Sequence, residues 1–122
     1  MGDFLKLGPK GEAYALALLR KRGHRLLEQN FRCAQGELDL VTWQHRTLVF
    51  TEVRTRARSS KCSPAETITP AKQRRVVRAA HWYLAKRVGS GAPPACRFDV
   101  VWLSAQAGEI TDGGVIEGAF TA

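Results

Sequence analysis

The sequence predicts one α/β domain over residues 1–122, and three patterns lead to this expectation. Two runs rich in β-branched and aromatic residues flank a short polar break within 36–56, which is typical of a β-hairpin. Helical signals stand on either side of this hairpin, before residue 24 and from residue 69 onward. A last apolar run reads as a buried strand. Helices that alternate with strands are typical of a domain in which helices cover a sheet.

Length and composition fit an ordinary globular protein. The chain has 122 residues, of which 44% are hydrophobic and 25% are charged, enough for one core covered by a few helices. No apolar run approaches the ~20 residues that a membrane span needs. Residues 1–10 lack the apolar segment of a secretory signal. We therefore expect a cytoplasmic protein without a membrane partner.

The cysteines argue against a disulfide framework or a zinc site. Cys33, Cys62 and Cys96 are odd in number and far apart in the chain. They form no CxxC pair and no metal-ligand spacing with the histidines. Reduced thiols are the expected state.

The net charge of +8 is unevenly distributed. Residues 54–97 contain eleven Lys or Arg and one acidic residue, whereas the remainder has eight basic and ten acidic residues. A local excess of this size predicts a polyanionic partner, and nucleic acid comes before a membrane because no strongly amphipathic anchor accompanies it. The alternative is charge that only keeps a helix face solvated.

The first helix is predicted to begin after residues 1–7, which we expect to be frayed. Pro9 suits a first helical turn, and Gly23 suits a C-terminal stop. Glu12 lies at the N-terminal end of the apolar stripe of this helix. Its carboxylate is either a favourable charge near the helix dipole or a third acid that points toward the hairpin.

A first strand is predicted over 24–31, around Leu26 and Leu27. Arg32 follows this strand. It is either a phosphate contact or a solvated loop residue, and its position alone does not decide between the two.

Two acids interrupt the apolar hairpin. Asp39 and Glu52 occupy positions where a core strand would carry Val or Ile, and an ionised carboxylate there is costly unless a cation compensates it. In the register whose opposed residue numbers sum to 91, Asp39 faces Glu52 and Glu37 faces Arg54. Opposed side chains lie roughly 5 Å apart at Cβ, whereas a slip by one residue separates the two acids. We predict the first register, and two close carboxylates without softer ligands suit Mg²⁺ or Mn²⁺.

The same register predicts what the two faces of the hairpin carry. On the acid face, Val41 is opposed to Phe50 and Trp43 to Leu48. On the other face lies an apolar surface against which helices can pack, made of Leu38, Leu40, Val49 and Val53.

A basic loop over 57–68 precedes the longest predicted helix. Thr69 suits the N-cap of this helix, Pro70 its first turn and Gly89 its end. Its buried stripe is predicted to consist of Val76, Val77, Ala80 and Leu84.

The first turns of this helix carry polar residues. Gln73 lies on the side of the buried stripe, and Arg74, Arg75 and Arg78 project more outward. These arginines either form a solvated face or contact phosphates.

The C-terminal part begins with a buried strand over 96–103. Asp99 in this strand is either catalytic or part of a structural salt bridge near the start of the strand. A short edge strand over 109–111 follows a turn, and the segment up to Phe120 is weakly determined by its pattern.

Six short motifs then occur in an order that resembles a known family. They are Gly8-x-x-Gly11-Glu12-x-x-Ala15, Asn30-x-Arg32, Gly36-Glu37-x-Asp39-Leu40, Phe50-x-Glu52-Val53-Arg54-x-Arg56, Lys72-Gln73 and Arg97-Phe98-Asp99-Val100. Over nearly the whole chain this order resembles the YraN-like family of uncharacterised bacterial proteins. That family is similar to the restriction-endonuclease-like superfamily, which includes archaeal Holliday-junction resolvases. The resemblance implies a three-layer restriction-endonuclease-like domain, with a mixed central sheet built on a β-hairpin and flanked by helices.

The resemblance also implies a site. The superfamily has an Asp, a (D/E)xK tripeptide on the next strand and often a Glu from the first helix. Carried over, Asp39 and Glu52 bind a divalent metal together with the carbonyl of Val53, and Glu12 is the first-helix acid. Gln73 matches a helix residue that assists the site. The implied reaction is hydrolysis of a phosphodiester, in which the metal polarises the phosphate and helps to activate water.

Arg54 departs from the superfamily pattern, which has Lys at this position. Lys can orient or deprotonate the attacking water, whereas Arg stays charged and can only clamp a phosphate. Lys72 could supply an amine if its helix packs toward the hairpin. The tripeptide therefore supports the fold more strongly than the activity.

Three functional hypotheses follow. The first is a Mg²⁺- or Mn²⁺-dependent endonuclease that acts on DNA, including branched or damaged DNA. The resemblance to resolvases also implies that such an enzyme is a homodimer. The second is a non-catalytic nucleic-acid-binding module that has lost hydrolysis through Arg54. The third is a small basic RNA-associated protein whose acids are structural. The residues predicted to bind nucleic acid are Arg32, Arg56, Arg58, Lys61, Lys72, Arg74, Arg75 and Arg78.

Overall fold

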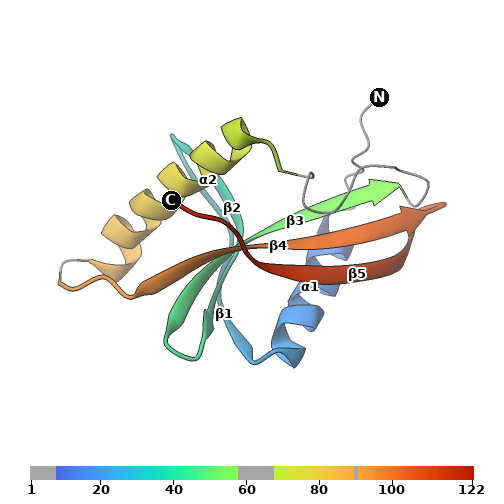
Figure 1. The fold of residues 1–122 in the computed structure, drawn as a ribbon, viewed down its shortest axis with the longest axis horizontal. Helices are drawn as coiled ribbons and strands as arrows, with labels where there is room; N and C mark the ends of the chain where they lie inside the picture. Colours follow the sequence, from blue (N-terminus) through green and yellow to red (C-terminus); the bar gives the residue numbers. More distant parts are fainter. Residues whose placement is uncertain (1–7, 58–67, 90) are drawn as a thin grey trace.

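The computed structural model describes residues 8–57, 68–89 and 91–122, which form one five-stranded sheet with two α-helices (Figure 1). In chain order the elements are α1 (Pro9–Lys21), β1 (His24–Cys33), β2 (Gly36–Gln44), β3 (Thr47–Ala57), α2 (Pro70–Tyr83), a π-helical turn (Leu84–Val88), β4 (Ala95–Gln106) and β5 (Glu109–Phe120).

The sheet is mixed, as the sequence predicts. Its strand order is β1-β2-β3-β4-β5, and every neighbouring pair is antiparallel except β3 and β4. A parallel pair needs a crossover connection, and the crossover between β3 and β4 contains α2. The α/β class is therefore confirmed.

The two helices begin and end close to the predicted positions. In α1, Pro9 lies in the first turn, and the N–H of Gly23 donates to the carbonyl of Arg20 just beyond the helix. Thr69 caps α2, because its Oγ1 accepts a hydrogen bond from the backbone N–H of Lys72 at 3.2 Å. The helical path then continues through the π-helical turn to Gly89.

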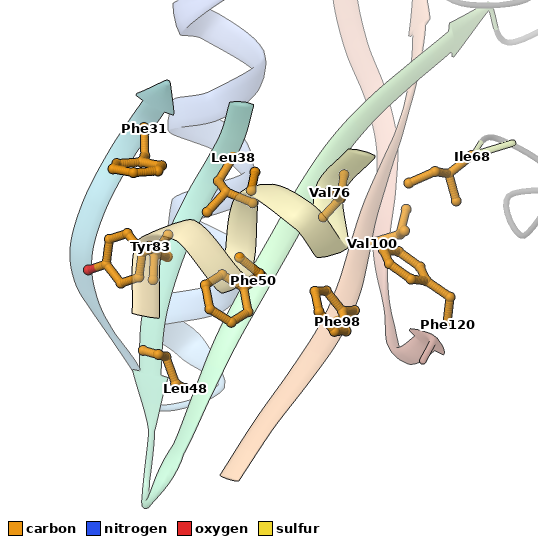
Figure 2. Packing of buried hydrophobic residues seen from close by; sticks show 13 residues of the cluster. Phe31, Leu38, Leu48, Phe50, Ile68, Val76, Tyr83, Phe98, Val100 and Phe120 are labelled. Carbon is orange, nitrogen blue, oxygen red and sulfur yellow. The ribbon is translucent and has the colours of Figure 1, made fainter. Parts of the chain in front are cut away.

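The helices cover opposite faces of the sheet, which gives three layers. On one face, α1 packs through Ala15 and Leu19 against a cluster that contains Leu40, Val101 and Leu103. On the other face, α2 packs against a larger aromatic cluster (Figure 2). The buried residues of α2 are Val76, Ala79, Ala80 and Tyr83. Val77 and Leu84, which were predicted to belong to the buried stripe, are only partly buried.

Aromatic contacts organise the larger cluster. Phe50 stacks on Phe98 with ring centroids 5.5 Å apart, and its other neighbour is Tyr83, edge-on at 5.9 Å. Phe31 contacts Tyr83 in the same edge-on manner at 5.1 Å. These ring contacts connect β1, β3 and β4 with the end of α2. The aromatic packing between α2 and the sheet is therefore continuous across these strands.

The prediction for the helix-packing face of the hairpin was partly wrong. Leu38 packs in the α2 cluster with Val41, whereas Leu40 and Val53 pack in the α1 cluster. Strict alternation would place Leu38 and Leu40 on one face. The alternation is therefore interrupted at Asp39, between these two residues.

The last strand is longer than predicted, because β5 runs over Glu109–Phe120 rather than 109–111. The Asp-Gly-Gly sequence in its middle reads as a turn, yet it lies within the strand. A Cβ on Gly113 would lie 2.8 Å from Cδ2 of Leu103, and one on Gly114 would lie 2.6 Å from Nε1 of Trp102. These glycines let β5 pass close to the side chains of β4.

Core packing gives a first prediction. Leu48 is fully buried in the α2 cluster, so Leu48→Ala should lower the free energy of unfolding by about 2–5 kcal/mol. Leu27→Ala is the matched control, because Leu27 is 39% exposed and should change stability by no more than about 0.5 kcal/mol. Urea denaturation measures both values, and equal losses would contradict the assigned core.

Candidate functional site

The candidate site lies where β2 and β3 separate. The two strands pair in the predicted register from Gln44 and Thr47 up to Leu40 and Thr51, and the pairing ends there. Beyond this point β2 stays with β1, and β3 stays with β4 as far as Ala57. Figure 2 shows the strands meeting at the hairpin and then diverging. Asp39 and Glu52 are the first residues past the last pair, and we call this place the fork.

The divergence corrects part of the predicted register. Glu37 does not face Arg54, because the ladder between β2 and β3 ends at Leu40 and Thr51. Glu37 keeps its partner Arg32 of β1, and Arg54 keeps its partner Trp102 of β4. Asp39 and Glu52 are likewise not ladder partners. The register is confirmed for the five pairs nearer the turn, and the strands are simply too far apart beyond them to continue it.

The two acids are instead joined by hydrogen bonds between side chains and backbone. The N–H of Val53 donates to Oδ2 of Asp39 at 2.9 Å, and the N–H of Asp39 donates to Oε2 of Glu52 at 3.4 Å. Each strand thus presents a carboxylate to the other strand's backbone in place of a ladder partner. The structure therefore brings Asp39, Glu52 and Val53 together, as the sequence predicts.

Burial makes this pair of carboxylates unusual. Glu52 is 1% exposed, and its burial, followed by the nearby charge of Asp39, raises the pKa of Glu52 to about 8. Burial is also the main reason that the pKa of Asp39 is raised, although the hydrogen bond from Val53 opposes this shift. A metal ion binds carboxylates in their ionised form, and the burial of Asp39 and Glu52 disfavours this form.

Lys72 is a cation that contacts the pair. Its Nζ lies 3.8 Å from Oε1 of Glu52, and its side chain is only 23% exposed. It belongs to the first turn of α2, which Thr69 caps. The positive charge of Lys72 lowers the pKa values of both Asp39 and Glu52. Lys72 was expected to supply an amine only if its helix packs toward the hairpin, and α2 does pack there.

Glu12 stands beside the fork. Oε1 of Glu12 accepts a hydrogen bond from Nδ2 of Asn30 at 3.0 Å, and the charge of Glu12 raises the pKa of Asp39. Asn30 has a left-handed backbone conformation, with φ of 53°. Asn30 was not predicted to belong to the site. The sequence signal for it is that Asn tolerates a left-handed backbone conformation better than most residues do.

The donor set fits a hard divalent cation. Asp39 and Glu52 offer carboxylate oxygens. Val53, whose N–H donates to Asp39, also lies at the fork. In the described part of the chain, no three His, Cys, Asp or Glu side chains gather as a metal-binding cluster. Mg²⁺ is often held by one or two carboxylates together with substrate phosphates and water, so two carboxylates are sufficient.

The other two predicted catalytic residues lie in different surroundings. Arg54 is half-buried, and its charge lowers the pKa of Glu52, so it acts on the fork. Gln73 donates from Nε2 to the carbonyl of Ile68 at 3.2 Å, which ties the start of α2 to the preceding segment. Gln73 lines a hollow together with Arg74 and other residues of α2, whereas Lys72 lines another.

Five of the eight residues predicted to bind nucleic acid line hollows on the two sides of α2. Arg32 and Arg75 line the hollow that contains Lys72, and Arg74 and Arg78 line the one that contains Gln73. The guanidinium of Arg56 lies 5.6 Å from the ring centre of Trp102. Arg58 and Lys61 lie outside the described residues.

Asp99 is structural. Arg97 donates to both of its carboxylate oxygens, at 2.8 and 2.9 Å, and the N–H of Gly118 donates to Oδ1 at 3.0 Å. The salt bridge expected near the start of this strand is therefore confirmed. Cys33 and Cys96 are free thiols, as expected, and Cys62 lies outside the described residues.

Comparison with known proteins places the chain among close relatives. Residues 11–103 match a family described as "Uncharacterised protein family UPF0102". The chain is 48% identical to a UPF0102 protein of Herminiimonas arsenicoxydans over 81% of this chain and 77% of that protein. It is 44% identical to one of Moorella thermoacetica over 93% of each chain, and 40% identical to one of Chlorobium phaeobacteroides over 91% and 85%. Within the described residues, no helix has the length and apolar character to cross a membrane.

The buried pair predicts how stability depends on pH without metal. Because the pKa of Glu52 rises from 4.5 to about 8 on folding, the folded state holds more protons between these values than the unfolded state. The contribution of Glu52 to the free energy of unfolding should therefore fall as the pH rises from 5 to 8, by at most about 1.4 kcal/mol per pH unit. The raised pKa of Asp39 acts in the same direction, whereas the lowered pKa of buried His24 acts in the opposite direction.

Denaturation at several pH values in EDTA measures this effect. Glu52→Gln removes the titrating group and keeps an oxygen for the N–H of Asp39, so its stability should vary less over this range. Glu109→Gln is the control, because Glu109 is an exposed residue paired with Lys10, and its pH dependence should follow the wild type. A stability of Glu52→Gln that falls as steeply from pH 5 to 8 as that of the wild type would contradict the burial argument.

Proposed function

The chain belongs to the UPF0102 family, and we propose that it is a metal-dependent nuclease of the restriction-endonuclease-like superfamily that hydrolyses phosphodiester bonds in DNA. The expected substrates are branched or damaged DNA. The observation that carries the proposal is the fork, where a buried carboxylate (Glu52) and a half-buried one (Asp39) from adjacent strands meet a lysine from the helix of the crossover.

The arrangement around the fork supports membership of the superfamily. The superfamily pattern has an Asp on one strand and a (D/E)xK tripeptide on the next. Asp39 and Glu52 match its two acids and converge here, whereas Arg54 stands in place of the Lys. The sheet is mixed, and helices cover both of its faces. A fold alone does not determine a function, so the proposal depends on the residues of the site.

The residues of the chain divide the work as follows. Asp39 is oriented by the N–H of Val53, and Glu52 by the N–H of Asp39, so both carboxylates are fixed before a ligand arrives. A bound Mg²⁺ or Mn²⁺ supplies Lewis acidity for the phosphate and for the attacking water. Lys72 and Arg54 place positive charge beside Glu52, where it favours binding of the scissile phosphate.

The charge distribution supports a nucleic-acid substrate. Five of the predicted contact residues lie along the hollows on either side of α2, namely Arg32, Lys72, Arg74, Arg75 and Arg78. Contacts of this kind with the phosphate backbone give affinity without sequence preference. This agrees with a substrate that is recognised by its shape.

A second candidate function rests on Arg54. Arginine cannot deprotonate water at neutral pH, so a chain with Arg in the tripeptide can keep phosphate binding and lose hydrolysis. In that case the protein is a nucleic-acid-binding module with a degenerate active site. Lys72 beside Glu52 favours the nuclease, because an amine is still present at the fork.

Metal binding can be tested without any substrate. Mg²⁺ or Mn²⁺ at a hundred times its dissociation constant should stabilise the wild type by about 2.7 kcal/mol, seen as a rise in Tm. Asp39→Asn should abolish this rise, because it removes one of the two carboxylates. Asp112→Asn, at an exposed position of β5, is the control and should keep it. An equal rise in Asp39→Asn would show that the metal binds elsewhere.

Cleavage tests the reaction itself. The wild type should cut labelled four-way junctions, flaps or nicked duplexes in Mg²⁺ or Mn²⁺ and be inactive in EDTA. Glu52→Gln should reduce the rate at least about a hundredfold, as loss of one preorganised charge-stabilising group does elsewhere. Arg54→Lys should increase the rate, because it restores an amine to the tripeptide.

Three other outcomes have defined meanings. Salt-sensitive DNA binding without cleavage by either the wild type or Arg54→Lys would favour the binding module. Preferential RNA binding that Asp39→Ala leaves unchanged would favour an RNA-associated protein. Cleavage that survives Glu52→Gln would indicate a contaminating nuclease or a different active site.

A further inference from the structure

A hollow of about 320 Å³ lies between the β1–β2 turn and α2. It is lined by Arg32, Cys33, Gly36, Glu37, Lys72 and Arg75. Three of these six side chains are cationic and one is anionic, so the lining carries a net charge of about +2 at neutral pH. A concave surface with this charge is suited to an anion.

The hollow exists because the β1–β2 turn comes close to α2. A Cβ on Gly36 would lie 3.3 Å from the backbone oxygen of Arg75, so a larger residue there would require this part of α2 to shift by a few tenths of an ångström. Glycine allows this approach, and it brings Arg32 of β1 to the same hollow as two residues of α2. The cations therefore come from two elements whose relative position the backbone fixes.

The anionic member of the lining does not close the hollow. Glu37 pairs with Arg32, with Oε2 3.2 Å from Nε, but their side chains are 46% and 78% exposed. An exposed ion pair of this kind contributes about 0–1 kcal/mol. A phosphate oxygen can replace the carboxylate as the partner of Arg32 at little cost.

Lys72 connects the hollow to the fork. Its side chain lines the hollow, and its Nζ lies 3.8 Å from Oε1 of Glu52. Arg74 and Arg78, on the other side of α2, line a different hollow whose walls include Gln73, Thr121 and Ala122 but not Lys72. The two sides of the helix are thus not equivalent with respect to the acids.

We propose that the hollow lined by Arg32, Lys72 and Arg75 is a phosphate subsite that takes the backbone phosphate next to the scissile one. The nucleic-acid strand then passes from the fork along the β1–β2 side of α2. The identity of the ligand as a nucleic-acid strand rests on the proposed function. The subsite itself requires only the charges and the shape of the hollow.

Binding of a fluorescent single-stranded oligonucleotide in EDTA tests the subsite, because no cleavage occurs there. Arg32→Ala and Arg75→Ala should each weaken binding several-fold at low salt and lower the slope of log K against log [salt] by about 0.7, the value for one lost phosphate contact on a single strand. Both residues are exposed, so the variants should fold, and circular dichroism checks this.

The chain offers two matched comparisons. Arg25→Ala removes an exposed arginine from the opposite end of β1, and it should leave both the affinity and the slope unchanged. Arg74→Ala removes the neighbour of Arg75 on the other side of α2, and it should cost less affinity than Arg75→Ala. A loss from Arg74→Ala as large as that from Arg75→Ala would overturn the subsite, as would wild-type binding that Arg32→Ala and Arg75→Ala leave intact.

The result separates the subsite from the nuclease proposal. If Arg32→Ala and Arg75→Ala weaken binding selectively while no variant cleaves DNA, the subsite stands and the nuclease proposal fails. If the wild type cleaves DNA in a Glu52-dependent manner while all four arginine variants bind equally, the nuclease proposal stands and the subsite fails. Absence of oligonucleotide binding by the wild type overturns the subsite directly.

Discussion

Two needs of the fold are met by one pair of hydrogen bonds at the fork. Strands that diverge leave backbone N–H groups without ladder partners, and buried carboxylates need hydrogen-bond donors. The N–H of Val53 is bound by Asp39, and the N–H of Asp39 is bound by Glu52. An apolar side chain at either position would leave an N–H without its acceptor. The acids are therefore part of how the sheet opens, as well as candidates for chemistry.

The rest of the structure holds the fork in place. The β3 strand stays paired with β4 from Thr47 to Ala57, although its ladder with β2 ends at Thr51. On the other side, β2 is paired with β1 as far as Gly36. The α2 helix is fixed by its buried face and by its cap at Thr69, and these place Lys72 beside Glu52. The position of the lysine is thus a result of core packing, which links the aromatic cluster to the site.

Much of this arrangement could be predicted from the sequence, and the reasons for the failures are physical. Helix ends follow from Pro9, Gly23 and Thr69, because caps and stops depend on local chemistry. The hairpin register was predicted because it brings Asp39 and Glu52 close together. It holds for the five pairs near the turn, although these two acids are not themselves ladder partners. The fork could not be found this way, because the point where two strands part depends on what each strand pairs with on its other side. The full length of β5 was missed because its glycines serve close packing rather than a turn.

At the fork, burial and the charge of Asp39 disfavour the ionised form of Glu52 more than the cations of the chain favour it. Lys72 and Arg54 both stabilise the charge of Glu52, yet the pKa of Glu52 is still raised to about 8. The two cations therefore do not offset burial and the repulsion from Asp39. A divalent ion between the carboxylates would gain more than it would on the surface, since both acids are already oriented and partly desolvated. Among the contacts described at Glu52, Lys72 is the one that brings a primary amine to the fork, and the tripeptide of Glu52, Val53 and Arg54 has none of its own.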